Sequence, residues 1–207
     1  MRPLHIIISG GSSVGKSTLI QACLQKFEND EQWQPYNFVQ IHEVARDLLP
    51  GLGLTGEDLQ RYLDQGDNEA FANVQQQLIH EQILRFDEGQ HNNYLSDRSG
   101  FDALAYIHHY LNDQEQTDRI FETEEFQQMI RQCQHSLIFI ILPQRELQVV
   151  KDNVRIYTDY EDQLGYTRSL QYCYGKAGLH FSIITDLDLT ERLEFIEQHI
   201  HDYIHTT

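Results

Sequence analysis

Residues 10–18 read Gly-Gly-Ser-Ser-Val-Gly-Lys-Ser-Thr, and this stretch fits the pattern GxxxxGK[ST] at every fixed position. An apolar run at residues 4–9 precedes it, and a helical pattern begins at Lys16. Glycines let the backbone bend so that successive N–H groups converge on an anion at the N-terminus of a helix. We therefore predict a phosphate-binding loop between a first strand and a first helix.

Every residue of this loop is a candidate for binding the phosphates of ATP. The ammonium of Lys16 is expected to face solvent and the β- and γ-phosphates, and the hydroxyl of Ser17 is expected to coordinate Mg²⁺. The alternative is a glycine turn without function, which the complete match and the strand–helix setting disfavour. The predicted nucleotide-binding residues are Gly10, Gly11, Ser12, Ser13, Val14, Gly15, Lys16, Ser17 and Thr18.

Outward from the loop, short runs rich in β-branched and aromatic residues alternate with helical patterns. This alternation is typical of a parallel sheet covered by helices on both faces. We predict an α/β fold, a three-layer P-loop sandwich with a five-stranded parallel sheet in the order 2-3-1-4-5. The expected strands span residues 4–9, 37–42, 93–97, 136–142 and 180–185.

Helical patterns fill most of the remaining chain, and residues 50–53, Pro-Gly-Leu-Gly, are interpreted as a turn. The three glutamines at 75–77 fall on the polar side of a helical pattern, which predicts a solvated face. Residues 1–207 contain no repeat and no flexible linker, so we predict one domain, with a lid at about residues 143–158. The expected helices span residues 16–27, 56–64, 68–88, 101–112, 122–134, 159–177 and 191–203.

Composition limits the classes of partner. With 15 basic against 32 acidic residues, the net charge of −17 disfavours nucleic acid as a partner. No apolar run reaches the roughly 18 residues of a membrane helix, so no membrane association is expected. Three widely spaced cysteines without a CxxC pair suit a reducing, cytoplasmic location. The expected partner is a small-molecule phosphate acceptor; oligomers are possible but not indicated.

An acid at the end of a buried strand is the second element that a magnesium nucleotide site needs. Asp97 ends the run at 93–97, at the carboxyl edge where ligands bind in open α/β sheets. We predict that Asp97 holds Mg²⁺ together with Ser17. The alternative is a helix cap, although Ser99 and Gly100 are at least as well placed for capping.

Charged residues after the second and third strands are candidates for binding and activating an acceptor. Glu43 can take the proton of an attacking hydroxyl, or it can be a helix-terminal carboxylate. Arg46, one turn later, can bind substrate or pair with Glu43. Arg98 is expected beside the transferring phosphoryl group. Asp102 can hydrogen-bond a sugar hydroxyl or form a local ion pair.

A basic cluster follows the fourth strand in this otherwise acidic chain. Arg145, Lys151 and Arg155 lie where a mobile lid would bring positive charge to the γ-phosphate, and Arg155 is the strongest catalytic candidate. The alternative is a solvated amphipathic helix. The loop at residues 186–189 after the fifth strand is a candidate for base selectivity.

Several of these segments resemble one family of small P-loop proteins. They are the loop itself, Glu43-Val44-Ala45-Arg46, the stretch Asp97-Arg98-Ser99-Gly100-Phe101-Asp102-Ala103-Leu104-Ala105-Tyr106, residues 152–157, Leu164-Gly165-Tyr166, and the final Glu191-Arg192-Leu193-Glu194-Phe195-Ile196. The family comprises AAA-type ATPases similar to nucleoside kinases and to the ribosylnicotinamide kinase domain. The resemblance implies that Glu43 is the catalytic base and that Asp97-Arg98-Ser99 corresponds to the Asp-Arg or Glu-Arg-Ser motif of those kinases.

Together these features predict transfer of the γ-phosphate of ATP to a nucleoside-like hydroxyl with Mg²⁺. Lys16, Glu43, Arg98 and Arg155 are the expected catalytic residues. The acceptor would lie among Glu43, Arg46, Arg98, Asp102 and Tyr106. The missing Asn-Lys-x-Asp pattern disfavours GTP. A nucleotide hydrolase and a nucleotide-dependent switch remain the alternatives, and neither needs an acceptor pocket.

Overall fold

A five-stranded parallel sheet forms the centre of the computed structural model, which describes residues 3–145, 156, 158–185 and 188–206. The strand order is β2-β3-β1-β4-β5, and every neighbouring pair is parallel. The predicted fold class and strand order are therefore confirmed. The strands are β1 (His5–Gly10), β2 (Val39–Ile41), β3 (Tyr94–Asp97), β4 (Leu137–Ile141) and β5 (Ser182–Ile184).

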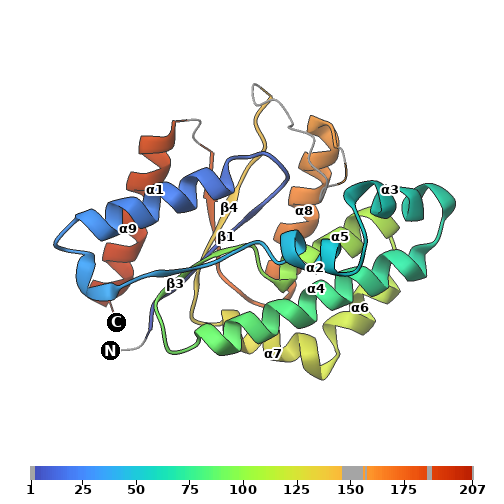
Figure 1. The fold of residues 1–207 in the computed structure, drawn as a ribbon, viewed down its shortest axis with the longest axis horizontal. Coiled ribbons are helices and arrows are strands. Elements are labelled where there is room, and N and C mark those ends of the chain that lie inside the picture. Colours follow the sequence, from blue (N-terminus) through green and yellow to red (C-terminus); the bar gives the residue numbers. More distant parts are fainter. Residues whose placement is uncertain (1–2, 146–155, 157, 186–187, 207) are drawn as a thin grey trace.

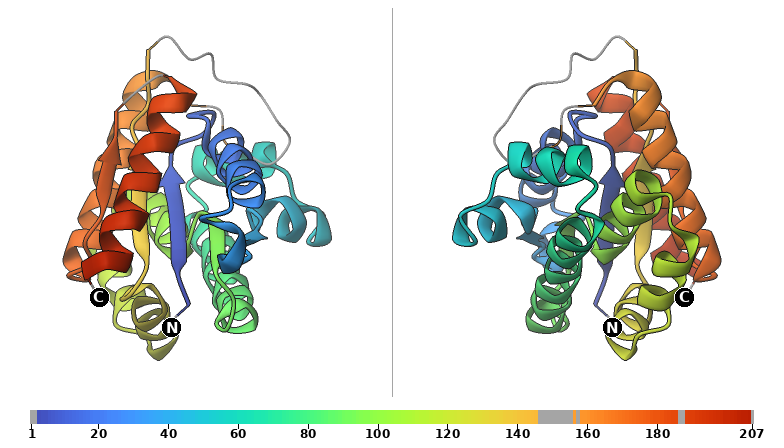
Figure 2. Two further views of the ribbon diagram at one scale, coloured as in Figure 1. Left: turned by 90° about the vertical axis from the view of Figure 1, so that its left-hand side faces the viewer. Right: turned by 90° about the vertical axis from the view of Figure 1, so that its right-hand side faces the viewer.

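Helices cover both faces of the sheet (Figure 1). One face carries α1 (Lys16–Asn29) and α9 (Leu189–Thr206), and the other carries α4 (Asn68–Gly89), α5 (Gly100–Tyr106), α7 (Glu124–Cys133) and α8 (Tyr160–Lys176). Both termini lie at the end of the sheet opposite the turn that follows β1 (Figure 2). The other helices described are α2 (Ala45–Gly51), α3 (Gly56–Gln65) and α6 (Gln114–Phe121).

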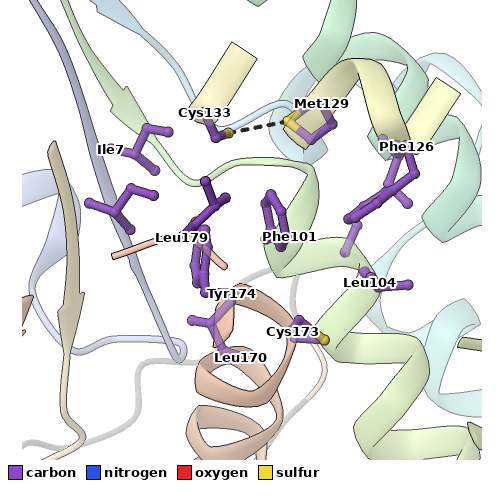
Figure 3. Close-up of a cluster of buried hydrophobic side chains, with 14 of the residues drawn as sticks. Ile7, Phe101, Leu104, Phe126, Met129, Cys133, Leu170, Cys173, Tyr174 and Leu179 are labelled. Carbon is purple, nitrogen blue, oxygen red and sulfur yellow. Dashed lines mark hydrogen bonds between the residues drawn. The ribbon is translucent and has the colours of Figure 1, made fainter. Parts of the chain in front are cut away.

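Two hydrophobic clusters fix these layers to the sheet. Ile6 and Ile8 of β1 face the cluster under α1 and α9, whereas Ile7 faces the cluster under α4, α5, α7 and α8. In the second cluster the ring of Phe101 stacks on Tyr174 at 4.4 Å between centroids and meets Phe126 edge-on at 5.0 Å (Figure 3). Burying both faces explains why residues 6–8 of β1 are a continuous apolar run rather than an alternating one.

The helices depart from prediction at three places. Residues 45–51 form α2, although Pro50 suggested a turn; the proline lies in the last turn, where the helix is about to end. The expected helix at 101–112 divides into α5 and a π-helical turn, Ile107–Leu111, which ends at Asn112 in the left-handed region. The short helix α6 was not predicted.

Gln75 corrects the predicted solvated face of the glutamines, because its side chain is buried. Its neighbour Gln77 is exposed as expected. The buried glutamine lines a pocket described below. None of the helices in the described ranges is long and apolar enough to cross a membrane.

Candidate active site

The loop between β1 and α1 adopts the bent conformation that its glycines predict. Gly10 has φ 141° and Gly15 has φ 91°. A Cβ on Gly10 would lie 2.7 Å from the carbonyl oxygen of Ile141, because β1 and β4 converge there. Ser13 also has a positive φ, 58°. This backbone can turn successive N–H groups toward an anion in front of α1.

Lys16 is buried against the loop instead of facing solvent, which corrects the expectation for its side chain. Its ammonium donates to the carbonyl oxygens of Gly10 at 3.0 Å and Gly11 at 2.6 Å. The carbonyl groups of the bent loop thus hold the positive charge of Lys16 next to the backbone N–H groups of the loop. Ser17 and Thr18 are exposed in the first turn of α1, whereas Ser12 and Val14 are buried.

Asp97 and Ser17 meet where the ends of β3 and α1 come together. The Ser17 hydroxyl donates to Oδ2 of Asp97 at 2.7 Å. The other oxygen, Oδ1, is buried and has no hydrogen-bond partner among the described residues. A hydroxyl beside a carboxylate with a free oxygen fits Mg²⁺, which takes few protein ligands and completes its shell with water and phosphate. Ser99, not Asp97, caps α5.

Arg98 connects the loop to the residues after β2. Its Nε donates to Oε1 of Glu43 at 2.8 Å, while Nη1 donates to the Gly10 carbonyl at 2.8 Å and to Oδ1 of Asp102 at 3.0 Å. Nη1 also lies 3.4 Å from the Tyr166 hydroxyl. Burial alone would lower the pKa of Arg98, but the charge of Glu43 and its other neighbours raises that pKa well above its usual value. The guanidinium is therefore a permanent charge.

The backbone of Arg98 is held in an unusual conformation for a residue with a side chain. Its φ is 77°, in the left-handed region that L-residues rarely occupy. Two hydrogen bonds stabilise it: Arg98 N donates to the Ile8 carbonyl at 3.0 Å, and the Ser96 hydroxyl donates to the Arg98 carbonyl at 2.7 Å. The chain turns sharply here, which directs the guanidinium back across the end of β1.

Asp102 is buried, and both of its carboxylate oxygens accept hydrogen bonds from other groups of the protein. Its Oδ2 accepts from the Ser9 hydroxyl at 2.7 Å and from Ser99 N at 3.1 Å, where it completes the capping box of α5. Its Oδ1 accepts from Arg98 and, at 3.5 Å, from Gly10 N. These contacts favour the ion-pair alternative for Asp102 over a sugar hydroxyl.

Glu43 lies between two arginines. Oε1 accepts from Arg98, and Oε2 forms an ion pair with Arg46 Nε at 3.0 Å. Glu43 is 4% exposed, whereas the Arg46 side chain is 45% exposed. The structure therefore contains the ion pair that was one of the two predictions for Arg46, and this side chain is not part of the lining of the adjacent pocket.

A pocket opens directly beside Glu43 and Arg98. Its empty space of about 580 Å³ counts every gap between atoms and open solvent, and the part that admits a water-sized group is about 60 Å³. It brings together Glu43, Arg98, Asp102 and Tyr106 of the five residues predicted to bind the acceptor. The rest of its lining is Val44, Ala45, Leu49, Leu59, Gln75, Leu78, Gln82, Ser99, Ala103 and Ile156.

The predicted lid lies largely outside the described residues. Lys151 and Arg155 fall in the range 146–155, and two residues of the proposed base-selectivity loop, 186 and 187, are outside as well. Arg145 is described: its guanidinium lies 4.7 Å from the centroid of the Tyr160 ring and pairs with Glu161 at 3.1 Å. Asp188 caps the first turn of α9.

Three residues at the site were missed from the sequence. Tyr166 of α8 places its hydroxyl 3.1 Å from Oδ1 of Asp102. The side chain of Gln163, one turn earlier, packs against Gly11, and Arg192 of α9 donates to the Val14 carbonyl at 2.7 Å. Tyr166 and Arg192 both belong to segments that resemble the P-loop family, and that position was the available signal.

The strand order, the bent loop after β1 and the acid at the end of β3 together define a P-loop protein. The chain belongs to the AAA domain family, whose model matches residues 5–192. No curated protein matches the sequence. Among solved structures, the fold is similar to thymidylate kinase from Candida albicans, with a TM-score of 0.58 and 14% identity over 97% of this chain and 92% of that one.

Proposed function

We propose that this protein transfers the γ-phosphate of ATP to the hydroxyl of a nucleoside-like small molecule. The observation that carries the proposal is the position of Arg98. Its guanidinium bonds on one side to the loop carbonyl of Gly10 and on the other to Glu43 at the pocket. One charge thus lies between the proposed donor and acceptor sites, where a transferring phosphoryl group develops negative charge.

Binding of the donor would rest on the loop and its neighbours. The N–H groups of residues 10–18 and the ammonium of Lys16 suit the phosphates of ATP. Ser17 and the unpartnered Oδ1 of Asp97 would hold Mg²⁺. When bound, the ion neutralises charge on the β- and γ-phosphates.

Glu43 would bind and orient the acceptor hydroxyl. Its carboxylate borders the pocket and is fixed by Arg98 and Arg46, so an entering hydroxyl can donate to it and lose its proton there as the new bond forms. Arg98 would stabilise charge at the reacting phosphoryl group. Arg155 keeps its proposed catalytic role only as an expectation from the sequence.

The pocket supports this function over its alternatives. A hydrolase or a switch needs room for water but no lined cavity beside the γ-phosphate, whereas a kinase needs a second binding site. Thymidylate kinase, the similar structure, is itself a kinase by name, which agrees with the proposal at the level of fold.

The test is ADP release by the purified protein with ATP and Mg²⁺, with and without a panel of nucleosides and vitamin precursors. We expect at least one member to stimulate turnover and to be recovered as its phosphate ester. Turnover that no acceptor stimulates would support the hydrolase instead.

A further inference from the structure

We propose that Arg192 of α9 is a positioning residue for the phosphates of the donor nucleotide. By holding the backbone carbonyl of Val14, it directs the N–H group of Gly15 toward the bound phosphates. The inference rests on one part of the proposed function, the binding of ATP by the loop at residues 10–18, and it is independent of the acceptor. Arg192 lies 178 positions after Val14 and outside the loop pattern.

The first observation is a short hydrogen bond from a buried guanidinium to the loop. Nη1 of Arg192 donates to the carbonyl oxygen of Val14 at 2.7 Å. Arg192 is 4% exposed and Val14 is 1% exposed, so water competes little for this contact. A hydrogen bond from a charged donor is about twice as strong as one between neutral groups. The Val14 carbonyl is therefore held firmly on the side of the loop that faces α9.

The second observation is that a firmly packed helix carries this arginine. Asp188 caps the first turn of α9 through its Oδ1, which accepts from Thr190 N at 2.7 Å. Ile196 and Ile200 of the same helix are fully buried in the hydrophobic cluster that also holds α1 (Figure 1). Because α1 begins within the loop, the packing of these two helices fixes the guanidinium relative to the loop.

Holding the carbonyl of Val14 also fixes the direction of the N–H group of Gly15. A peptide bond is planar and trans, so the C=O of one residue and the N–H of the next point in opposite directions. With its carbonyl bound to Arg192, this peptide presents its N–H to the opposite side of the loop. Successive N–H groups that point the same way form an anion nest. The arginine thus sets the direction of one donor of the nest.

Gly15 makes this contact possible because it has no side chain. Its φ of 91° is one that glycine adopts readily, and the peptide between Val14 and Gly15 can rotate at little cost unless it is held. A Cβ on Gly15 would lie 3.0 Å from Nη1 of Arg192, which is tighter than most such contacts. The glycine therefore admits the guanidinium, and the guanidinium removes the freedom that the glycine leaves.

Arg192 differs from two other cations that donate to loop carbonyls. Lys16 and Arg98 both donate to the Gly10 carbonyl, at 3.0 and 2.8 Å. Lys16 is also proposed to bind phosphate, and Arg98 also bonds to Glu43 beside the pocket. Arg192 is not among the residues that line that pocket. A substitution of Arg192 therefore tests the geometry of the loop without changing the pocket.

The experiment measures the Kd of ATP with Mg²⁺ by isothermal titration calorimetry. Arg192→Met keeps the apolar stem and removes every donor, so we expect its Kd to rise about 5- to 30-fold, because one backbone residue must then be ordered on binding. Arg192→Lys keeps the charge but not the planar fork, and its Kd should rise about two- to fivefold. Arg168→Met, which changes an exposed arginine of α8, is the control and should match the wild type.

Thermal melts of the nucleotide-free proteins separate positioning from a purely structural role. Where Arg192→Met keeps the wild-type Tm, a raised Kd supports the inference and an unchanged Kd overturns it. Where Arg192→Met melts lower or does not fold, Arg192→Lys decides in the same way.

The same titrations distinguish this inference from the proposed function. A wild-type protein that binds ATP but is stimulated by no acceptor would refute the kinase, and the Kd values of the variants would still decide the role of Arg192. A wild-type protein that binds no ATP would overturn both.

Discussion

The phosphate-binding loop and the pocket beside Glu43 lie on either side of Arg98, yet they are built in opposite ways. The loop comes from nine consecutive residues, 10–18, and works mainly through its backbone. The pocket gathers side chains from residues 43 to 156. A site made of consecutive residues has its geometry set by local conformation, whereas one made of distant residues depends on how the helices pack. The two regions should therefore respond differently to mutation.

The largest effect is expected from Lys16→Ala, which should abolish detectable turnover. The substitution removes the ammonium that the Gly10 and Gly11 carbonyls hold beside the loop. The phosphates of ATP would then lose a positively charged partner. Turnover and ATP binding are measured together with a thermal melt. Lys26→Ala is the control, since Lys26 is at the other end of α1 and pairs with Glu197 at 3.6 Å. A folded Lys16→Ala protein with normal turnover would exclude the P-loop mechanism.

The second largest effect is expected from Glu43→Gln, which changes a residue that lines the pocket. Glu43→Gln keeps the shape of the side chain but removes the proton acceptor, so acceptor-stimulated ADP release should drop by about 10²- to 10⁴-fold. The KM of ATP should change little, because Glu43 reaches the loop through Arg98. Glu69→Gln, at an exposed position in the first turn of α4, is the control.

This pair of variants sharpens the comparison between the regions. Lys16→Ala should impair ATP turnover with or without an acceptor, whereas Glu43→Gln should impair only the acceptor-dependent part. If Glu43→Gln left stimulated turnover intact, the carboxylate would be a structural partner of its two arginines and the kinase proposal would lose its base.

A smaller effect is expected from Asp97→Asn, of about 100-fold in turnover. The amide would keep the contact with Ser17 but lose the charge beside it, so more Mg²⁺ should be needed for half-maximal activity. A magnesium titration of the variant, with the exposed Asp64→Asn of α3 as control, measures this directly. Titration curves that coincide with wild type would leave Asp97 with a structural role alone.

The fold could be predicted from the sequence because its signals are local. Each strand is a short apolar run, and the loop pattern between residues 10 and 18 fixes where β1 ends and α1 begins. Asp97 was predicted for the same reason, since it ends a buried strand. These features need no knowledge of which helix packs on which.

For the pocket, the sequence predicted some of the lining residues but not their contacts with one another. Glu43 and Arg98 were identified as candidates, but their 2.8 Å contact joins residues 55 positions apart. Gln75 was assigned to solvent because a helical pattern shows which residues share a face, not what that face packs against. The place of Asp102 in the capping box of α5 was likewise hidden, because the same carboxylate suits a sugar hydroxyl equally well.

The smallest effect is expected from a change in Tyr166 of α8, which lies between the loop and the pocket. Tyr166→Phe removes the hydroxyl that donates to Asp102 Oδ1 at 3.1 Å, and Asp102 retains its bond from Arg98. We expect a loss of about 1 kcal/mol in the free energy of unfolding and a few-fold drop in turnover. Tyr172→Phe is the control on the same helix, because its hydroxyl accepts from Gln114 at an exposed position.

The pH dependence of Tyr166→Phe separates its hydrogen bond from a titrating role. Burial and the negative charge of Asp102 raise the pKa of Tyr166 well above its usual value, so the phenol stays protonated in the folded protein. The loss of stability should therefore be the same between about pH 6 and about pH 9, below the ordinary tyrosine pKa. Urea unfolding of both variants across this range measures it. A stability loss that disappears toward the upper end would mean that the hydroxyl ionises in the native protein, and Tyr166 would then not be a fixed donor to Asp102.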